Sequence, residues 1–295
     1  MKKRILYIIN PNSGVHKNPH LEQMIKEISS RYENDFEVHH TAASKHAIEI
    51  SRKAANDGFD TIVAVGGDGS VNETAQGIIG SKATLGIIPN GSGNGLARHL
   101  KLPLDHRKAI ELINTGEHEL IDTVKINDNF CIGIIGIGFD AHIAHLFAKA
   151  GKRGYSTYAK LVLTEFYKYH SAVYNLQVDQ KEVVKECFLL TIANSSQFGN
   201  NAVIAPFADI QDGTLDISMM KKFPFIVAPY LIYKLMSNTI HHSKYFERMT
   251  GKEIVVRNSG ILRGHIDGEA VTFNGDIHVK IVPMSLNVIV PQTTK

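Results

Sequence analysis

The sequence predicts an α/β fold in two parts: a Rossmann-like parallel sheet covered by helices, then a β-rich, sandwich-like second domain. Over the first third of the chain, short and almost wholly apolar runs alternate with stretches of helical spacing, as in parallel sheets buried on both faces. From about residue 127, short extended runs bounded by Gly, Asn or Asp dominate, which is typical of antiparallel strands and turns. The 295 residues favour two domains, and we place them at 1–125 and 126–295.

The elements of the first domain follow from these periods. Strands are expected over residues 5–9, 36–40, 61–65 and 84–88, helices over 21–31 and 46–56, and further helices from about Val71 and from about Asn94. Ligands of such sheets bind beyond the carboxyl ends of the strands. We therefore expect the function of the first domain to lie in the loops that follow its strands.

The second domain is expected to consist mainly of short strands, interrupted by two longer helical stretches over residues 141–170 and about 226–246. Cys131 and Cys187 both lie in apolar runs, and we interpret them as buried free thiols of a cytoplasmic protein. The apolar stretches fall short of the roughly 20 residues that span a bilayer. A net charge of +3 is too small to indicate a nucleic-acid partner, so none is expected.

Three glycine-containing turns follow three strands of the first domain: NPNSG from Asn10, GGDGS from Gly66 and PNGSGNG from Pro89. One such turn is a weak signal. Because the carboxyl ends of parallel strands meet at one edge of a sheet, the backbone N–H groups of all three turns are expected to converge on one anion. This arrangement favours a nucleotide or phosphate ligand over three coincidental turns.

The second of these loops carries a carboxylate at its centre. Gly66, Gly67 and Gly69 permit close backbone approach to a ligand, whereas Asp68 beside a phosphate is repelled unless a cation or a transferable proton lies between them. Asp68 is therefore expected to hold Mg²⁺ or to accept the proton of an attacking hydroxyl. Both roles belong to phosphoryl transfer.

The same loop ends in a candidate helix start. Ser70 and Glu73 stand in the S-x-x-E spacing of a capping box, in which side chains satisfy the first backbone amides of a helix. For Ser70, capping and phosphate contact are equally good interpretations. For Glu73, capping is the better one.

The second domain contributes two acidic motifs. In HIDGEAV, Asp267 and Glu269 are two residues apart, so in an extended strand both side chains share a face; the alternative is a surface turn, for which Asp-Gly is favourable. In ADIQDGTLDI, Asp209, Asp212 and Asp216 indicate either a hairpin or a metal site with oxygen ligands. From the residues alone, the surface turn and the hairpin are favoured.

The motifs NPNSG, VAVGGDGSVNE, IIPNGSGNGLARHL and HIDGEAV, in this order and at these spacings, resemble those of the diacylglycerol kinase catalytic family. That family includes bacterial lipid kinases and the sphingosine and ceramide kinases, and the resemblance covers essentially the whole chain. GGDG alone is shared with phosphofructokinases and NAD kinases. The four motifs together are specific.

The resemblance implies an ATP-dependent kinase that phosphorylates a lipid hydroxyl, with ATP and Mg²⁺ bound. The residues that correspond to its nucleotide site are Asn10, Thr41, Gly66, Gly67, Asp68, Gly69, Ser70, Asn72, Glu73, Gly91, Ser92 and Asn94. Its catalytic carboxylate corresponds to Asp267 or Glu269, with Asp68 as the base in the sphingosine kinase manner. Its structural Mg²⁺ turn corresponds to the Asp212 side chain and to backbone oxygens of Asp209 and Thr214.

One motif departs from the family pattern. Bacterial diacylglycerol kinases usually carry G-T-G-N-D where this chain has G-S-G-N-G over residues 91–95, so an acidic residue is missing and the loop is closer to the sphingosine and ceramide kinase form. The lipid acceptor is thereby left open. The alternatives are a kinase of a soluble acceptor such as NAD, and a non-catalytic regulator that binds nucleotide or lipid. The retained Asp68 and Asp-Gly-Glu motif favour an enzyme over the regulator.

Two stretches of the second domain, 155–170 and 223–236, are rich in aromatic residues with Lys or His interspersed. We expect helices packed on the core of the domain, with an interfacial lipid-binding surface as the alternative. A transient, peripheral contact with the inner face of a membrane is compatible with this sequence, and so is a homodimer.

Overall fold

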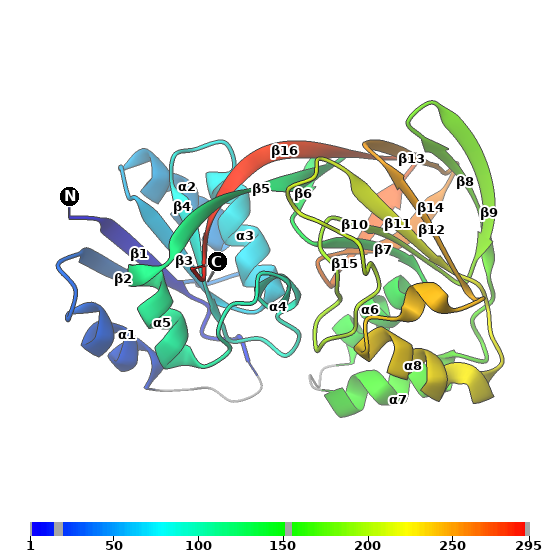
Figure 1. Ribbon diagram of the computed structural model, residues 1–295, viewed down its shortest axis with the longest axis horizontal. Coiled ribbons are helices and arrows are strands. Elements are labelled where there is room, and N and C mark those ends of the chain that lie inside the picture. The colour runs from blue at the N-terminus through cyan, green and yellow to red at the C-terminus, as the bar shows by residue number, and fades with distance from the viewer. Residues whose placement is uncertain (1, 15–19, 151–154, 293–295) are drawn as a thin grey trace. The chain divides into compact units, whose positions relative to one another are not determined.

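The computed structural model describes residues 2–14, 20–150 and 155–292. The chain forms two compact units: unit 1 consists of Met1–Ile121 and Met284–Lys295, and unit 2 of Asp122–Pro283. Unit 1 contains a parallel sheet with helices, whereas unit 2 is rich in antiparallel strands (Figure 1). The predicted fold class is confirmed.

The end of the chain departs from the division expected at residue 125. The last strand, β16 (Ile277–Val290), pairs antiparallel with β13 (Glu253–Arg257) in unit 2 and parallel with β4 (Thr84–Pro89) in unit 1. The expected second domain, 126–295, therefore includes a segment that the structure places in unit 1. An alternating apolar pattern identifies such a strand, but it does not indicate the strand's partner.

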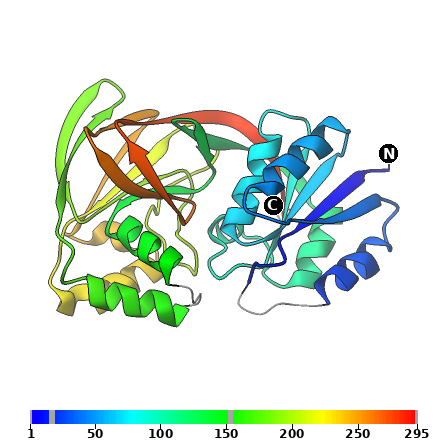
Figure 2. The same ribbon diagram turned by 180° about the vertical axis from the view of Figure 1, so that it is seen from behind.

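Unit 1 alternates strands and helices along the chain. Its elements are β1 (Arg4–Ile9), α1 (Leu21–Ser29), β2 (Asp35–His40), α2 (His46–Asn56), β3 (Thr61–Gly66), α3 (Asp68–Ile78), β4, α4 (Gly95–His99), α5 (His106–Thr115) and the first half of β5 (Glu117–Ile126). The strands β2-β1-β3-β4-β16 lie in this order, and each neighbouring pair is parallel. Helices α1 and α5 cover one face of the sheet, and α2 and α3 cover the other (Figures 1 and 2).

The core of unit 1 follows from strands that are apolar on both faces. Every residue of β3 and of β4 is buried. On one face, Tyr7 and Val63 pack with Ile25 of α1 and Ile110 of α5. This two-sided burial is the reason that these strands lack the polar alternation of a sheet exposed on one side.

Helices α2 and α3 approach each other closely at Gly77. A Cβ atom at this position would lie 2.7 Å from the carbonyl oxygen of Ile48 and 2.8 Å from the amide nitrogen of Arg52, and it would overlap the Ser51 hydroxyl. Because two of these three contacts are with backbone atoms, a change of rotamer does not relieve them. Glycine at this position sets the separation of the two helices.

Unit 2 is a sandwich of two sheets with helices outside it. Its elements are the second half of β5, β6 (Asn129–Cys131), β7 (Ile134–Gly138), α6 (Phe139–Lys149), α7 (Tyr155–Glu165), β8 (Ala172–Val178), β9 (Lys181–Cys187), β10 (Leu189–Ala193), β11 (Leu215–Met220), η1 (Phe225–Val227), α8 (Ala228–Met236), η2 (Ile240–His242), β12 (Phe246–Gly251), β13, β14 (Ile261–Ile266), β15 (Glu269–Asn274) and the first half of β16. One sheet has the order β12-β11-β10-β7-β14-β15, and β16, β13, β8 and β9 belong to the other. Ile135 and Ile217 of the first sheet share one core with Leu176 and Ile254 of the second.

The two long helical stretches expected in unit 2 are interrupted. The first, 141–170, consists of α6 and α7, and residues 151–154 lie outside the described residues. The second, 226–246, is divided into η1, α8 and η2. Asn238, in a left-handed conformation (φ 58°) just after α8, separates α8 from η2. Leu231 of α8 packs on Ile134 of the six-stranded sheet.

Both cysteines are buried and free, as predicted. Two buried cysteines without a disulfide agree with packing thiols and not with a disulfide framework. In the part of the chain that the structure describes, no helix is long and apolar enough to cross a membrane.

The contact at Gly77 gives a stability prediction. Gly77→Ala is expected to lower the free energy of unfolding by about 1–3 kcal/mol, the usual cost of overpacking a tight interface, measured by urea denaturation. Gly80→Asn is the matched control in unit 1, because Gly80 has a left-handed φ of +76° with open space around it, a conformation that Asn tolerates. Equal stability of the two variants would contradict the packing role of Gly77.

Candidate functional site

Three polar loops of unit 1 lie side by side because their strands end in register. Ile9 is aligned with Val65, and the next residue of β3, Gly66, is aligned with Pro89. The loops that follow β1, β3 and β4 therefore leave the same edge of the parallel sheet, as predicted. We call them loop 1 (residues 10–14), loop 2 (66–70) and loop 3 (90–95).

Side-chain and backbone hydrogen bonds connect the three loops. Asn10 Nδ2 donates to Ser70 Oγ at 3.0 Å, which links loop 1 to loop 2. The N–H of Asn90 donates to the carbonyl oxygen of Gly66 at 2.7 Å, and Asn90 Nδ2 donates to Ser13 Oγ at 3.3 Å. The loops thus form one hydrogen-bonded surface. Asn90, which sequence reasoning missed, contacts both of the others.

Loops 2 and 3 touch through their backbones. A Cβ atom on Gly91 would lie 2.5 Å from Cα of Gly67, and one on Gly67 would lie 3.1 Å from Cα of Gly91. Gly14 of loop 1 has φ +87°, and a Cβ there would lie 2.9 Å from the carbonyl oxygen of Asn90. Glycine is needed at these positions because a side chain would separate the loops.

Asp68 lies at the start of α3, and Gly69 follows it. Its Oδ1 accepts the N–H of Gly95, the first residue of α4, at 2.7 Å. The carboxylate thus has a structural contact that the sequence argument did not find. Gly95 stands where the family pattern carries an acidic residue, and here its amide joins loop 3 to loop 2.

The predicted capping box is wrong. Helix α3 begins at Asp68 with Gly67 as its N-cap, so Ser70 is its third residue and not its cap. The Ser70 hydroxyl contacts loop 1 instead. Glu73 accepts the backbone N–H of Lys45 at 2.8 Å, and Lys45 is the left-handed N-cap residue of α2. Glu73 therefore accepts a backbone amide at the start of the neighbouring helix, α2.

The other candidate nucleotide residues lie on or beside the same loops. Asn94 is left-handed (φ 53°), and its side chain closes loop 3 by two hydrogen bonds of 2.9 Å with the backbone of Gly91. Ser92 is exposed in the same loop. Asn72 is buried on α3, and the N–H of Thr41 donates to the last carbonyl of β1 at 2.9 Å.

In unit 2, the HIDGEAV motif forms a β-hairpin. Ile266 pairs with Glu269, so Asp267 and Gly268 are the two turn residues. Both have positive φ angles, 48° and 84°, as a two-residue type I′ turn requires. The expectation that Asp267 and Glu269 share one face of an extended strand is therefore wrong, and the turn interpretation is correct.

The Asp267 carboxylate folds back onto the connection between β6 and β7. Its Oδ1 accepts the N–H groups of Gly133 at 2.9 Å and Ile134 at 2.8 Å, and its Oδ2 accepts the N–H of Ile132 at 3.1 Å. The thiol of Cys131 donates to Oδ1 at 3.3 Å. Three successive amides that converge on one anion form a backbone nest, so Asp267 fixes the hairpin to this connection.

The two carboxylates of the motif thus have different environments. Burial, together with the Asp267 carboxylate, raises the pKa of the Cys131 thiol well above its ordinary value, so the thiol stays protonated and remains a donor to Asp267. Glu269 is exposed at the start of β15. Glu269 is therefore the more exposed carboxylate of this motif.

The ADIQDGT turn precedes β11 and does not form a tight hairpin, because the antiparallel partner β10 already ends at Ala193. Asp212 Oδ1 accepts both the N–H and the hydroxyl of Thr214, each at 2.8 Å. Asp209 Oδ1 accepts the N–H of Gln211 at 3.0 Å. These bonds fix the carboxylates over the turn.

Asp216 does not belong to this turn. It is buried in β11 and forms an ion pair with Arg248 of β12. Among the described residues, no three His, Cys, Asp or Glu side chains gather as a metal site. A metal at the turn would depend on the Asp212 carboxylate and on backbone oxygens.

A buried network connects this turn with the Asp267 nest. The N–H of Gly213 donates to Asp122 Oδ2 at 2.8 Å. Asn194, 1% exposed, donates through Nδ2 to the carbonyl oxygens of Asp122 at 2.9 Å and Ile132 at 2.7 Å. Sequence reasoning missed Asp122 and Asn194. The sequence pattern that could have identified them is a polar residue at the end of an otherwise apolar run.

A second buried pair supports the hairpin from α6. His265, 4% exposed, lies with Nε2 at 3.1 Å from Asp140 Oδ2. Gly136 provides the space, because a Cβ there would overlap both side chains. Sequence reasoning missed this pair as well.

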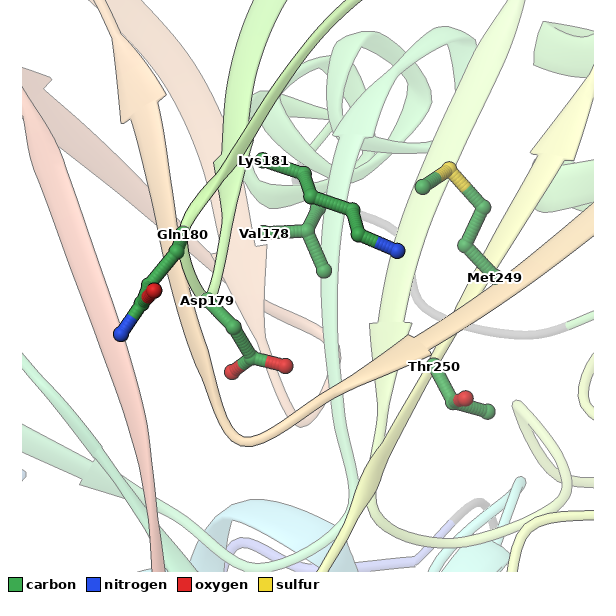
Figure 3. Close-up of a pocket in the computed structure, with 6 residues that line it drawn as sticks. All are labelled: Val178, Asp179, Gln180, Lys181, Met249 and Thr250. Atoms are coloured by element: carbon green, nitrogen blue, oxygen red, sulfur yellow. The ribbon is translucent and has the colours of Figure 1, made fainter.

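A surface pocket of about 510 Å³ lies at the β8–β9 turn (Figure 3). It is lined by Val178, Asp179, Gln180, Lys181, Met249 and Thr250. The carboxylate of Asp179 accepts the N–H groups of Lys252 at 2.9 Å and Glu253 at 3.0 Å. It therefore fixes the β8–β9 turn to the start of β13. None of the candidate site residues lines this pocket.

Comparison with known proteins identifies the family. Residues 4–126 match the diacylglycerol kinase catalytic domain, and residues 133–290 match the YegS C-terminal NAD kinase beta sandwich-like domain. The chain belongs to the diacylglycerol kinase family. Over 232 residues it is 31% identical to the diacylglycerol kinase of Bacillus subtilis strain 168, a match that covers 75% of this chain and 74% of that protein.

Further proteins similar to this chain support the same assignment. A Chromohalobacter salexigens protein named "Probable lipid kinase YegS-like" is 25% identical over 251 residues, which cover 83% of this chain and 80% of that protein. The crystal structure of a diacylglycerol kinase from Bacillus anthracis str. Sterne matches 100% of this chain and 98% of its own, with a TM-score of 0.76 and 19% identity. The latter confirms the fold.

The nest gives a prediction that separates structure from catalysis at Asp267. Asp267→Asn places an amino group against a backbone amide, so it leaves one buried donor without an acceptor. We expect a loss of about 1–3 kcal/mol in the free energy of unfolding, measured by thermal and urea denaturation. Asp128→Asn, at an exposed aspartate in the β5–β6 turn, is the control. Unchanged stability of Asp267→Asn would contradict the anchoring role.

Proposed function

We propose that this protein is an ATP-dependent lipid kinase that transfers the γ-phosphate of ATP to a lipid hydroxyl. The observation that carries the proposal is the hydrogen-bonded surface of loops 1 to 3, where backbone from three strand ends meets the Asp68 carboxylate. Such a surface suits a magnesium-bound polyphosphate. Membership of the diacylglycerol kinase family supports a lipid acceptor.

Unit 1 is proposed to bind ATP. The start of α3 is the positive end of a helix dipole, which favours a phosphate. The glycines of loops 2 and 3 let the backbone approach it without a steric barrier. The proposed contacts are Asn10, Thr41, Gly66, Gly67, Asp68, Gly69, Ser70, Asn72, Glu73, Gly91, Ser92 and Asn94.

Mg²⁺ fits the oxygen-rich surroundings of two places. Asp68 presents a carboxylate at the edge where the phosphates are proposed to bind, and Mg²⁺ held there would neutralise part of the phosphate charge. At the 209–214 turn, the Asp212 carboxylate and the carbonyl oxygens of Asp209 and Thr214 form the kind of donor set that hard cations prefer. The network through Asp122 holds that turn in place.

The proposed general base is Glu269. Both oxygens of Asp267 already accept backbone donors, so we assign Asp267 an anchoring role in the catalytic motif. Glu269 would accept the proton of the acceptor hydroxyl as its oxygen attacks the γ-phosphorus, and ADP would leave with the electrons of the broken P–O bond. Asp68 is the alternative base.

The acceptor is proposed to be diacylglycerol or a sphingoid lipid, which requires a peripheral contact with a membrane. The family that residues 133–290 match is named for a likeness to NAD kinase. NAD is therefore the soluble acceptor to test beside the lipids. The deciding experiment is transfer of radiolabelled phosphate from ATP to diacylglycerol, monoacylglycerol, phosphatidylglycerol, sphingosine, ceramide and NAD. Labelling of a lipid supports the proposal. Labelling of NAD alone, or of none of these acceptors, would refute it.

Substitution of Glu269 tests the assigned base. Glu269→Gln is expected to lower kcat by at least about 100-fold, the lower end of what a general base contributes, while affinity for a fluorescent ATP analogue is unchanged. Glu186→Gln, at an exposed glutamate of β9 in the same unit, should retain full activity. Retained kcat in Glu269→Gln would transfer the role to Asp68, which Asp68→Asn would then test.

A further inference from the structure

The outward face of α8 is apolar. The exposed fractions are 88% for Ile226 in η1 and, along α8, 53% for Tyr230, 54% for Ile232, 66% for Tyr233 and 59% for Met236. At about 100° per residue, these side chains and Pro229 lie within roughly half of the helix circumference. The opposite side, through Leu231, is buried on the six-stranded sheet. A helix on the surface of a water-soluble domain normally shows the reverse pattern on its outer face.

The apolar face continues beyond α8. Tyr167, just after α7, is 68% exposed, and its ring lies 5.3 Å from that of Phe225 in η1. Leu163 of α7 is 54% exposed, and α7 and α8 lie on the same side of unit 2 (Figures 1 and 2). We call the exposed residues of η1 and α8, together with Leu163 and Tyr167, the α8 surface. Its size exceeds the scattered single apolar residues of an ordinary surface.

The charges in the segment that carries α8 are of one sign, and Glu165, which lies between Leu163 and Tyr167, is paired with Lys168 and His142. Residues 221–245 contain four lysines and two histidines and neither aspartate nor glutamate. Lys234 lies 5.1 Å above the ring of Tyr230, within the surface itself. Lys244 and His242 are exposed at the end of the segment. An apolar patch with a basic border is complementary to a layer of anionic headgroups over hydrocarbon.

We propose that the α8 surface docks on a bilayer that carries anionic lipids. The proposal rests on the lipid kinase function, which requires access to a membrane-embedded acceptor. Tyrosine side chains suit such an interface because they combine an apolar ring with a hydroxyl that stays hydrated. A second copy of this chain is the less suitable occupant, because a two-fold contact would bring the lysines of one copy against those of the other.

Vesicle sedimentation tests the proposal without reference to catalysis. The full chain is mixed with sucrose-loaded vesicles of phosphatidylcholine, with or without phosphatidylglycerol, at low and at high salt. We expect binding that needs phosphatidylglycerol and weakens with salt. Equal binding to both kinds of vesicle, or binding to neither, would overturn the proposal.

Variants assign the binding to this surface. The triple variant Tyr230→Ser, Tyr233→Ser and Met236→Ser is expected to lower vesicle affinity at least tenfold with an unchanged melting temperature. The control, Val173→Ser with Val184→Ser, removes equally exposed apolar side chains from the β8–β9 hairpin and should bind as the wild type does. Equal affinity of the triple variant and the control would place docking elsewhere. A triple variant that only loses self-association, with its vesicle binding intact, would indicate a dimer interface and refute the proposal.

An activity assay keeps this inference separate from the proposed function. With the acceptor dispersed in detergent micelles, the triple variant should phosphorylate lipid at the wild-type rate, because the α8 surface contains none of the proposed catalytic residues. Vesicle binding without lipid phosphorylation by the wild type would contradict the kinase function but not the docking surface. Lipid phosphorylation with unchanged vesicle binding by the triple variant would contradict the docking surface alone.

Discussion

The common end point of three parallel strands is the constraint on which unit 1 depends. Because β1, β3 and β4 finish in register, three polar loops leave the sheet within hydrogen-bonding distance of one another. Glycines then let the backbones of loops 2 and 3 meet directly. The Asp68 carboxylate completes the surface by binding an amide of the third loop. The same atoms that hold the loops together therefore form the polar surface on which we propose that the phosphates of ATP bind.

In unit 2, a carboxylate holds separate backbone segments together, whereas in unit 1 glycines allow the loops to meet. Three amides of the β6–β7 connection converge on Asp267, and Asn194 and Asp122 extend the network to the 209–214 turn. Buried polar groups are costly unless every one is satisfied. These hydrogen bonds fix the hairpin that carries Glu269, although Asn194 Oδ1 is buried without a hydrogen-bond partner among the described residues.

Local pattern was sufficient for the strands of unit 1, for α1 and α2, and for the edge at which the loops gather, because apolar period and glycine spacing are local properties. Local pattern gave wrong side-chain contacts where a residue far away in the sequence is the actual hydrogen-bond partner. Ser70 and Glu73 match a capping box, but Asn10 and Lys45 compete for their side chains. Asp-Gly correctly indicated a turn at residue 267, whereas the amides that draw the Asp267 side chain inward lie more than a hundred residues earlier.

The return of β16 to unit 1 has a consequence for the order in which the protein folds during synthesis. Asn287 Nδ2 donates to Thr84 Oγ1 across 203 residues of chain, and the same segment pairs with β4. Unit 2 is continuous in sequence, from Asp122 to Pro283, so the ribosome releases all of it before the strand that covers the open edge of β4. An uncovered strand edge is a site of mispairing, and long-range pairing is slow. The nascent chain therefore carries unit 1 incomplete until unit 2 has been synthesised.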